Sequence, residues 1–212
     1  NQSGRRLVGG LLTVLVILAL SSSGYIGLWA QDGATNGELA VAAFDTPTTS
    51  SPIAMSQDKS TIWVVNPDDG SVSVLGNLDG TPSVLTTVRN VGREPQAIAL
   101  DTGVGTAQRA YVVSPPNNGV TVLKVNSLNP FTVVVEKRLT TGAEPWNVVA
   151  SPDGTRIFVA NSGQDTITVI NAQNQSIVGS VDLRKSICNV DDQNRHFQPR
   201  GLAVTLDNTR LY

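Results

Sequence analysis

A strand-and-turn unit that recurs along the chain constrains its fold more than any other feature of the sequence. In the clearest copy, residues 144–171, short β-branched and aromatic runs at 148–150, 156–161 and 166–170 are separated by turns rich in Pro, Asp and Gly. A fourth run follows at 175–183. Strands joined by turns this short pair antiparallel, because a parallel crossover needs a dozen or more residues. The unit therefore predicts a four-stranded antiparallel meander.

The repetition becomes visible when the second strands of the units are aligned. An aromatic residue recurs in this strand, at Trp63, Tyr111, Phe158 and Tyr212. The same number of residues then leads from the polar end of the strand to the next apolar run, from Asn66 to Val72, from Ser114 to Val120 and from Asn161 to Ile167. Four strands in a period of about 40–50 residues are typical of propeller blades. We predict an all-β chain with about three β-propeller blades plus a stub over residues 51–212, apolar on both faces of each blade because blades stack.

The segment GAEPWNVVASPDGTRIFVANSGQDTITVIN, residues 142–171, resembles a repeat of the YVTN family, the β-propeller repeats of surface-layer and YncE-like extracytoplasmic proteins. The resemblance covers roughly residues 51–212 and is weakest in the second unit, where residues 102–108 lengthen the first turn. It implies a closed propeller, most often of seven blades. It implies no single activity, since family members include surface-layer components, binding proteins and relatives of redox-enzyme subunits.

The N-terminal part of the chain is a membrane signal. Residues 7–30 carry no charged side chain and follow Arg5 and Arg6, and Tyr25 and Trp29 suit the outer interface of a bilayer. We expect residues 1–6 to be a cytoplasmic tail and residues 7–30 a transmembrane helix or uncleaved signal anchor in contact with lipid. The alternative is a cleaved signal peptide. Both interpretations place the propeller outside the cytoplasm, periplasmic or extracellular.

Residues 31–50 begin as a polar linker and contain an apolar run at 39–44. This run is expected either to close a propeller ring by joining its last blade or to edge the first blade. The chain begins at Asn1 and stops at Tyr212 inside a predicted strand. We therefore expect it to be part of a longer protein.

Composition excludes several classes of function. The net charge is −2 with 15% charged residues, and no basic stripe suits nucleic acid. His196 and Cys188 are the only residues of their types, too few for a metal or haem site or for a disulfide within the chain. The motif Asn174-Gln175-Ser176 is a weak match to a glycosylation sequon. We predict no catalytic, cofactor-binding or metal-binding residue.

The predicted topology gathers one set of loops on one face of the blades. In an antiparallel meander, the turn between the second and third strands lies beside the link to the next blade, and loops on a rigid scaffold often bind partners. The long link at 184–199 is expected to be the main contact, and the face to be mildly acidic. The alternative is that its polar residues serve turn formation. The candidate partner-binding residues are Asp68, Asp69, Asn117, Asn118, Gln164, Asp165, Asp191 and Asp192.

Two classes of function follow from the sequence. The favoured one is a membrane-tethered, extracytoplasmic propeller that binds protein partners or acts as a structural subunit of a membrane or cell-surface assembly. The alternative is the propeller part of a periplasmic enzyme, dehydrogenase-like or lactonase-like, whose chemistry lies in other blades or on another chain.

Overall fold

The computed structural model describes residues 49–50, 52–102, 108–188 and 196–212. Residues 7–30, the apolar run at 39–44 and the candidates Asp191 and Asp192 lie outside these ranges. Within them, no helix is long and apolar enough to cross a membrane.

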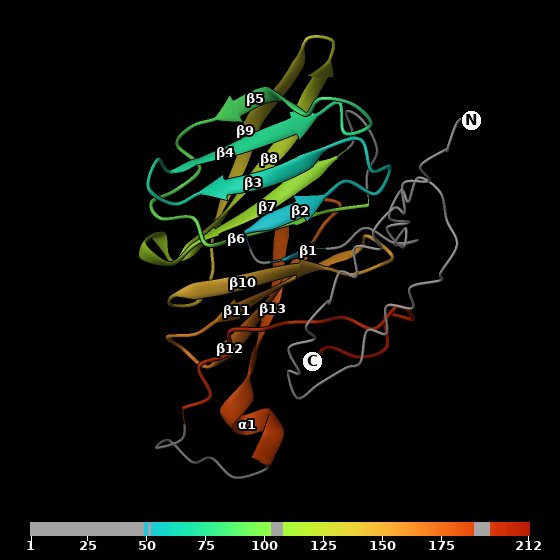
Figure 1. Cartoon of the computed structure of the whole chain (residues 1–212). Coiled ribbons are helices and arrows are strands. Elements are labelled where there is room, and N and C mark those ends of the chain that lie inside the picture. Colours follow the sequence, from blue (N-terminus) through green and yellow to red (C-terminus); the bar gives the residue numbers. More distant parts are fainter. Residues whose placement is uncertain (1–48, 51, 103–107, 189–195) are drawn as a thin grey trace, which may run out of the picture. The chain divides into compact units, whose positions relative to one another are not determined.

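The described chain forms three antiparallel sheets, each made of consecutive strands (Figure 1). The first sheet holds β1 (Thr49–Ser50), β2 (Ile53–Met55), β3 (Ile62–Asn66), β4 (Ser71–Gly76) and β5 (Ser83–Val88). The second holds β6 (Ala97–Leu100), β7 (Arg109–Ser114), β8 (Gly119–Leu128) and β9 (Phe131–Thr140). The third holds β10 (Pro145–Ala150), β11 (Arg156–Asn161), β12 (Thr166–Asn171) and β13 (Ser176–Asp182). The prediction of an all-β chain of four-stranded meanders is confirmed, with β1 as an added edge strand.

The three sheets are equivalent in register. Trp63 pairs with Val74, Tyr111 with Val122 and Phe158 with Val169. Trp63 and Tyr111 are fully buried, whereas Phe158 is only partly buried. The reason is that Phe158 faces the incomplete fourth unit. It lines a pocket together with Val204 and Leu211 and does not pack against a complete sheet.

A bulge recurs at the same place in the outer strand of every sheet. The register shifts opposite Val74–Leu75, Val122–Leu123 and Val169–Ile170, and the unpaired extra residues are Leu85, Glu136 and Val178. In β9 the bulge changes the face to which side chains point, so Val133 and Val135 pack on the first sheet and Leu139 on the third. A single outer strand thereby contacts both neighbouring sheets.

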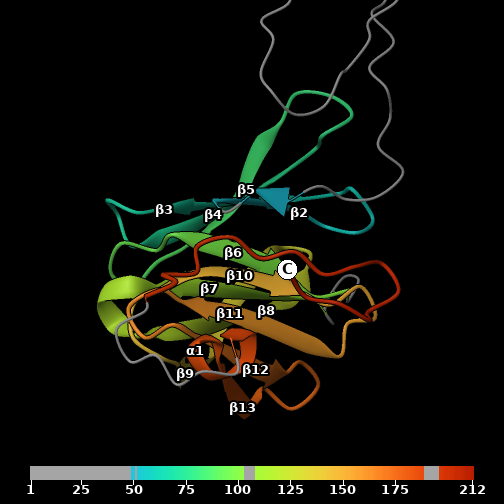
Figure 2. The same ribbon diagram turned by 90° about the horizontal axis from the view of Figure 1, so that it is seen from below.

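The second sheet is apolar on both faces because it lies between the other two. In β6, Ile98 and Leu100 join a cluster with Trp63, whereas the alternating Ala97 and Ala99 join a cluster with Ile157. The turned view in Figure 2 shows β2 to β5 as a layer apart from the strands of the later sheets. The stacking of blades that the sequence predicted is confirmed for these three sheets.

Residues 202–212 begin a fourth unit. The backbone groups of Ala203 and Tyr212 exchange two hydrogen bonds of 2.8 Å, and Val204 bridges to Leu211. The short helix α1 (Leu183–Cys188) was not predicted. It starts after Asp182, whose carboxylate accepts a 3.0 Å bond from the Arg184 N–H, as helix-capping side chains do.

Candidate functional site

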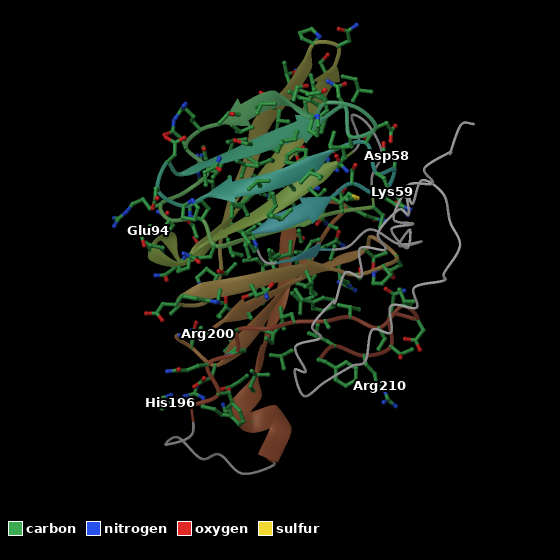
Figure 3. All side chains as sticks on the ribbon, in the orientation of Figure 1. Asp58, Lys59, Glu94, His196, Arg200 and Arg210 are labelled. Atoms are coloured by element: carbon green, nitrogen blue, oxygen red, sulfur yellow. The ribbon has the colours of Figure 1, made fainter. Side chains whose placement is uncertain are left out.

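The predicted gathering of loops on one side of the blades is confirmed by the hydrogen bonds that join them. We call this set the loop edge: turns 67–70, 115–118 and 162–165, links 89–96 and 141–144, and the described parts of the last link, 183–188 and 196–199. Figure 3 shows Glu94, Arg200 and His196 along this edge, with Asp58, Lys59 and Arg210 along the other.

Each turn of the loop edge ends in a residue with left-handed backbone: Gly70 (φ 60°), Asn118 (φ 49°) and Asp165 (φ 55°). Gly, Asn and Asp are the residues that adopt this conformation most readily. The carbonyl of each accepts a hydrogen bond from the start of the following link, at Val91 (3.1 Å), Thr141 (2.9 Å) and Leu183 (3.0 Å). Turn and link are therefore fixed to each other in all three sheets.

Four of the candidate residues strengthen this connection through their side chains. Asn117 Oδ1 accepts a 2.7 Å bond from the Arg93 N–H, and Asn118 Oδ1 a 2.9 Å bond from the Glu144 N–H. Gln164 Oε1 accepts a 3.1 Å bond from the Ala143 N–H. Asp165 Oδ1 accepts bonds of 2.8 Å from the N–H groups of both Phe197 and Gln198. Through these bonds the turns are connected to the links between one sheet and the next.

Asp165 holds the last link against the third sheet. Its side chain is 4% exposed, and Oδ2 lies 3.1 Å from Nδ1 of His196. Burial by itself raises the pKa of this carboxyl, but the bonds from Gln198, Phe197 and His196 outweigh it and keep the pKa below the ordinary value. The link does more than cross the surface, because removing His196, Phe197 and Gln198 would leave a buried carboxylate without three partners.

A concave site of the loop edge lies between the first and second sheets. This open pocket of about 730 Å³ is lined by Pro67, Asp68, Asp69, Gly70, Asn90, Gly92, Arg93, Glu94, Asn117 and Arg138. It brings together the candidates Asp68, Asp69 and Asn117 but not Asn118, Gln164 or Asp165.

The pocket is mixed in charge rather than mildly acidic. Asp69 is paired with Arg89 at 2.7 Å, and the Ser71 hydroxyl and Arg89 hold its pKa below the ordinary value. Arg93 and Arg138 add positive charge, and Arg138 donates a 2.7 Å bond to the Asn90 carbonyl. The expectation of a mildly acidic face counted carboxylates alone, and within this pocket the arginines offset them. Arg93 could have been found from its place in the repeated Gly-x-Glu-Pro link, whereas nothing in the sequence relates Arg138 to the pocket.

The opposite edge carries a repeated polar turn between the first and second strands of a unit. Asp58, Asp153 and Asp207 each accept hydrogen bonds from a Ser or Thr two residues before and another two residues after. The side-chain bonds from Ser56, Ser151 and Thr205 are the largest influence on these carboxyls, and they lower the pKa of each. All three Asp accept these bonds within their own turns, so the three carboxylates stabilise the turns of this edge.

No group of three or more His, Cys, Asp or Glu side chains that could hold a metal ion is found in the described ranges. His196 is 67% exposed and contacts Asp165.

No known protein family and no curated protein matches this sequence. Solved structures do match its fold. Hydrazine synthase of Kuenenia stuttgartiensis superposes with a TM-score of 0.58 at 22% identity, over 83% of this chain and 44% of that one. A putative 6-phosphogluconolactonase of Bacteroides uniformis gives 0.57 at 16%, over 84% and 50%. The β-propeller domain of Cps50 (Swd1) from Myceliophteria thermophila gives 0.50 at 11%, over 64% and 43%.

This chain thus spans half the length of these structures or less. At such identities the similarity concerns the fold alone, and it supports the assignment of the three sheets as β-propeller blades.

Proposed function

We propose that this chain belongs to a membrane-tethered, extracytoplasmic β-propeller of the YVTN type that binds a protein partner through its loop edge. The YVTN-like repeat at 142–171 and the apolar segment at 7–30 support the placement outside the cytoplasm. The loop edge supports the binding role.

The observation that carries the proposal is a group of unused charges around the pocket. Asp68, Arg93 and Glu94 are exposed, and their side chains have no hydrogen-bond or ion-pair partner among the residues that the structure describes. The backbone beneath them is fixed, since Val91 bonds to Gly70 and Arg93 to Asn117. Charges of both signs held on a rigid concave surface suit complementary charges of a protein partner.

The test is charge reversal with a matched control. D68K and E94K should each lower recovery of the partner at least tenfold when the full chain is purified from its native membrane. D79K is the control, because Asp79 is an equally exposed aspartate in the β4–β5 turn at the opposite edge. Recovery with D68K and E94K equal to that with D79K would refute docking at the pocket.

The second candidate is the propeller part of an enzyme. It is favoured by the likeness to hydrazine synthase and to a putative 6-phosphogluconolactonase, and by a pocket within the roughly 300–1,000 Å³ range of small-molecule sites. The full chain would then hydrolyse 6-phosphogluconolactone. Loss of this activity in R93Q, with activity retained in R156Q far from the pocket, would support the enzyme function. Equal rates with and without the protein would count against it.

A further inference from the structure

Trp146 is placed unusually for a large aromatic residue in this fold. It is the extra residue of a β-bulge at the start of β10, because Pro145 pairs with Asn161 and Asn147 pairs with Ala160. Bulges redirect a side chain away from the alternation of the strand. Whereas Trp63 is fully buried, Trp146 is half-buried and belongs to neither hydrophobic cluster. Its indole is thus available at the loop edge.

Arg200 lies over this indole. Its guanidinium carbon is 4.4 Å from the ring centroid, within cation–π range. Asn147, the next residue of β10, donates a 3.0 Å bond from Nδ2 to the Arg200 carbonyl. Just upstream, Phe197 and Gln198 are bound to Asp165. Arg200 is therefore held by its side chain, its backbone and the segment that precedes it.

The donors of this guanidinium are unused. Arg89, Arg109 and Arg184 each pair with a carboxylate. In contrast, the side chain of Arg200 donates no hydrogen bond and forms no ion pair within the described part of the chain, although it is exposed. An arginine stacked on an aromatic face keeps its planar fork of N–H groups free for a bidentate acceptor.

We propose that Trp146 and Arg200 form a binding site for a carboxylate group. The fork of Arg200 matches the two oxygens of a carboxylate, and stacking on the indole fixes its orientation before binding. Glu144 and Asp165 lie on the same edge, and their negative charge opposes a doubly charged phosphate more than a singly charged carboxylate. The carboxylate belongs either to a small organic acid or to the C-terminus of a peptide.

The experiment uses two pairs of probes on the full chain in mild detergent. Hexanoate is compared with hexanamide, and a hexapeptide with a free C-terminus is compared with its amide, by calorimetry and tryptophan fluorescence. Saturable binding of either carboxylate, without binding of its amide, is the expected result. Hexanoate binding assigns the site to organic acids, and binding of the peptide alone assigns it to a chain terminus.

Variants locate the site. R200Q should weaken carboxylate binding at least tenfold, and R156Q should leave it unchanged, because Arg156 is also exposed but forms no cation–π pair within the described part of the chain. D68K should also leave it unchanged, which separates this site from the pocket proposed for the protein partner. Equal binding of the amides, equal binding by R200Q and wild type, or no saturable signal with either carboxylate would each overturn the proposal.

Discussion

Replacement of Asp165 tests whether the loop edge is held together as the structure indicates. Asp165 combines a left-handed backbone with a buried carboxylate that accepts bonds from Phe197, Gln198 and His196. The repeat itself supplies the comparison residues. The equivalent position is Asn118 in the second sheet and Gly70 in the first. Asn retains a side-chain acceptor and tolerates the left-handed backbone. Gly tolerates this backbone but has no acceptor, and Ala has neither property.

The expected losses of unfolding free energy follow from these differences. Each N–H group left without an acceptor costs about 1–3 kcal/mol, and the lower end applies because Gln198 is exposed to water. Left-handed backbone costs a residue such as Ala about 1–2 kcal/mol more. D165A should therefore lose about 3 kcal/mol, D165G about 2 kcal/mol and D165N less than about 1 kcal/mol.

Equilibrium urea unfolding of the full chain, followed by circular dichroism and tryptophan fluorescence, measures these losses. The wild type should also lose stability in acid. Because the folded state lowers the pKa of Asp165, its contribution is present above the ordinary pKa and disappears as the pH falls through the lower, folded value. D165N should lack this part of the pH dependence. If D165N is as unstable as D165A, the charge rather than the acceptor stabilises the link, and the reasoning is wrong.

Three further predictions concern the core, the opposite edge and the N-terminus. Trp63→Ala should lower the free energy of unfolding by about 3–5 kcal/mol and Phe158→Ala by about half as much, because only Trp63 is fully buried. Equal losses for the two variants in urea unfolding would contradict this difference in burial. Ser151→Ala should raise the pKa of Asp153 towards its ordinary value, since Ser151 Oγ donates to it; an unchanged carboxyl titration by NMR would contradict this. The natural protein should keep residues 7–30, as intact mass would show, whereas a mature N-terminus near Ser22 or Gln31 would identify a cleaved signal peptide.

The strands could be predicted from the sequence because their signals repeat. Trp63, Tyr111 and Phe158 occupy the same register, and the polar residue at the strand end always precedes a turn of the same length. The bulges could not, because Leu85, Glu136 and Val178 share no chemical type and are defined only by pairing. The Ser/Thr partners of Asp58, Asp153 and Asp207 were visible in the sequence and overlooked.

The candidate site could be predicted in part, because the repeated strands fix which turns lie on the loop edge. Turn residues such as Asp68 could be assigned to the loop edge from topology alone. Whether a side chain there is free or occupied depends on distant partners, such as Arg89 for Asp69 and Phe197 for Asp165. The stacking of Arg200 on Trp146 likewise joins residues from two units, and no spacing in the sequence indicates it.

Site-specific photocrosslinking would show whether the loop edge is the binding surface. In the full chain, in its native membrane, a photoreactive amino acid replaces either residue 68, at the pocket, or residue 79, in the turn at the opposite edge. We expect one discrete crosslinked protein from position 68 and none from position 79. The same crosslinked protein from both positions, or from position 79 alone, would contradict it.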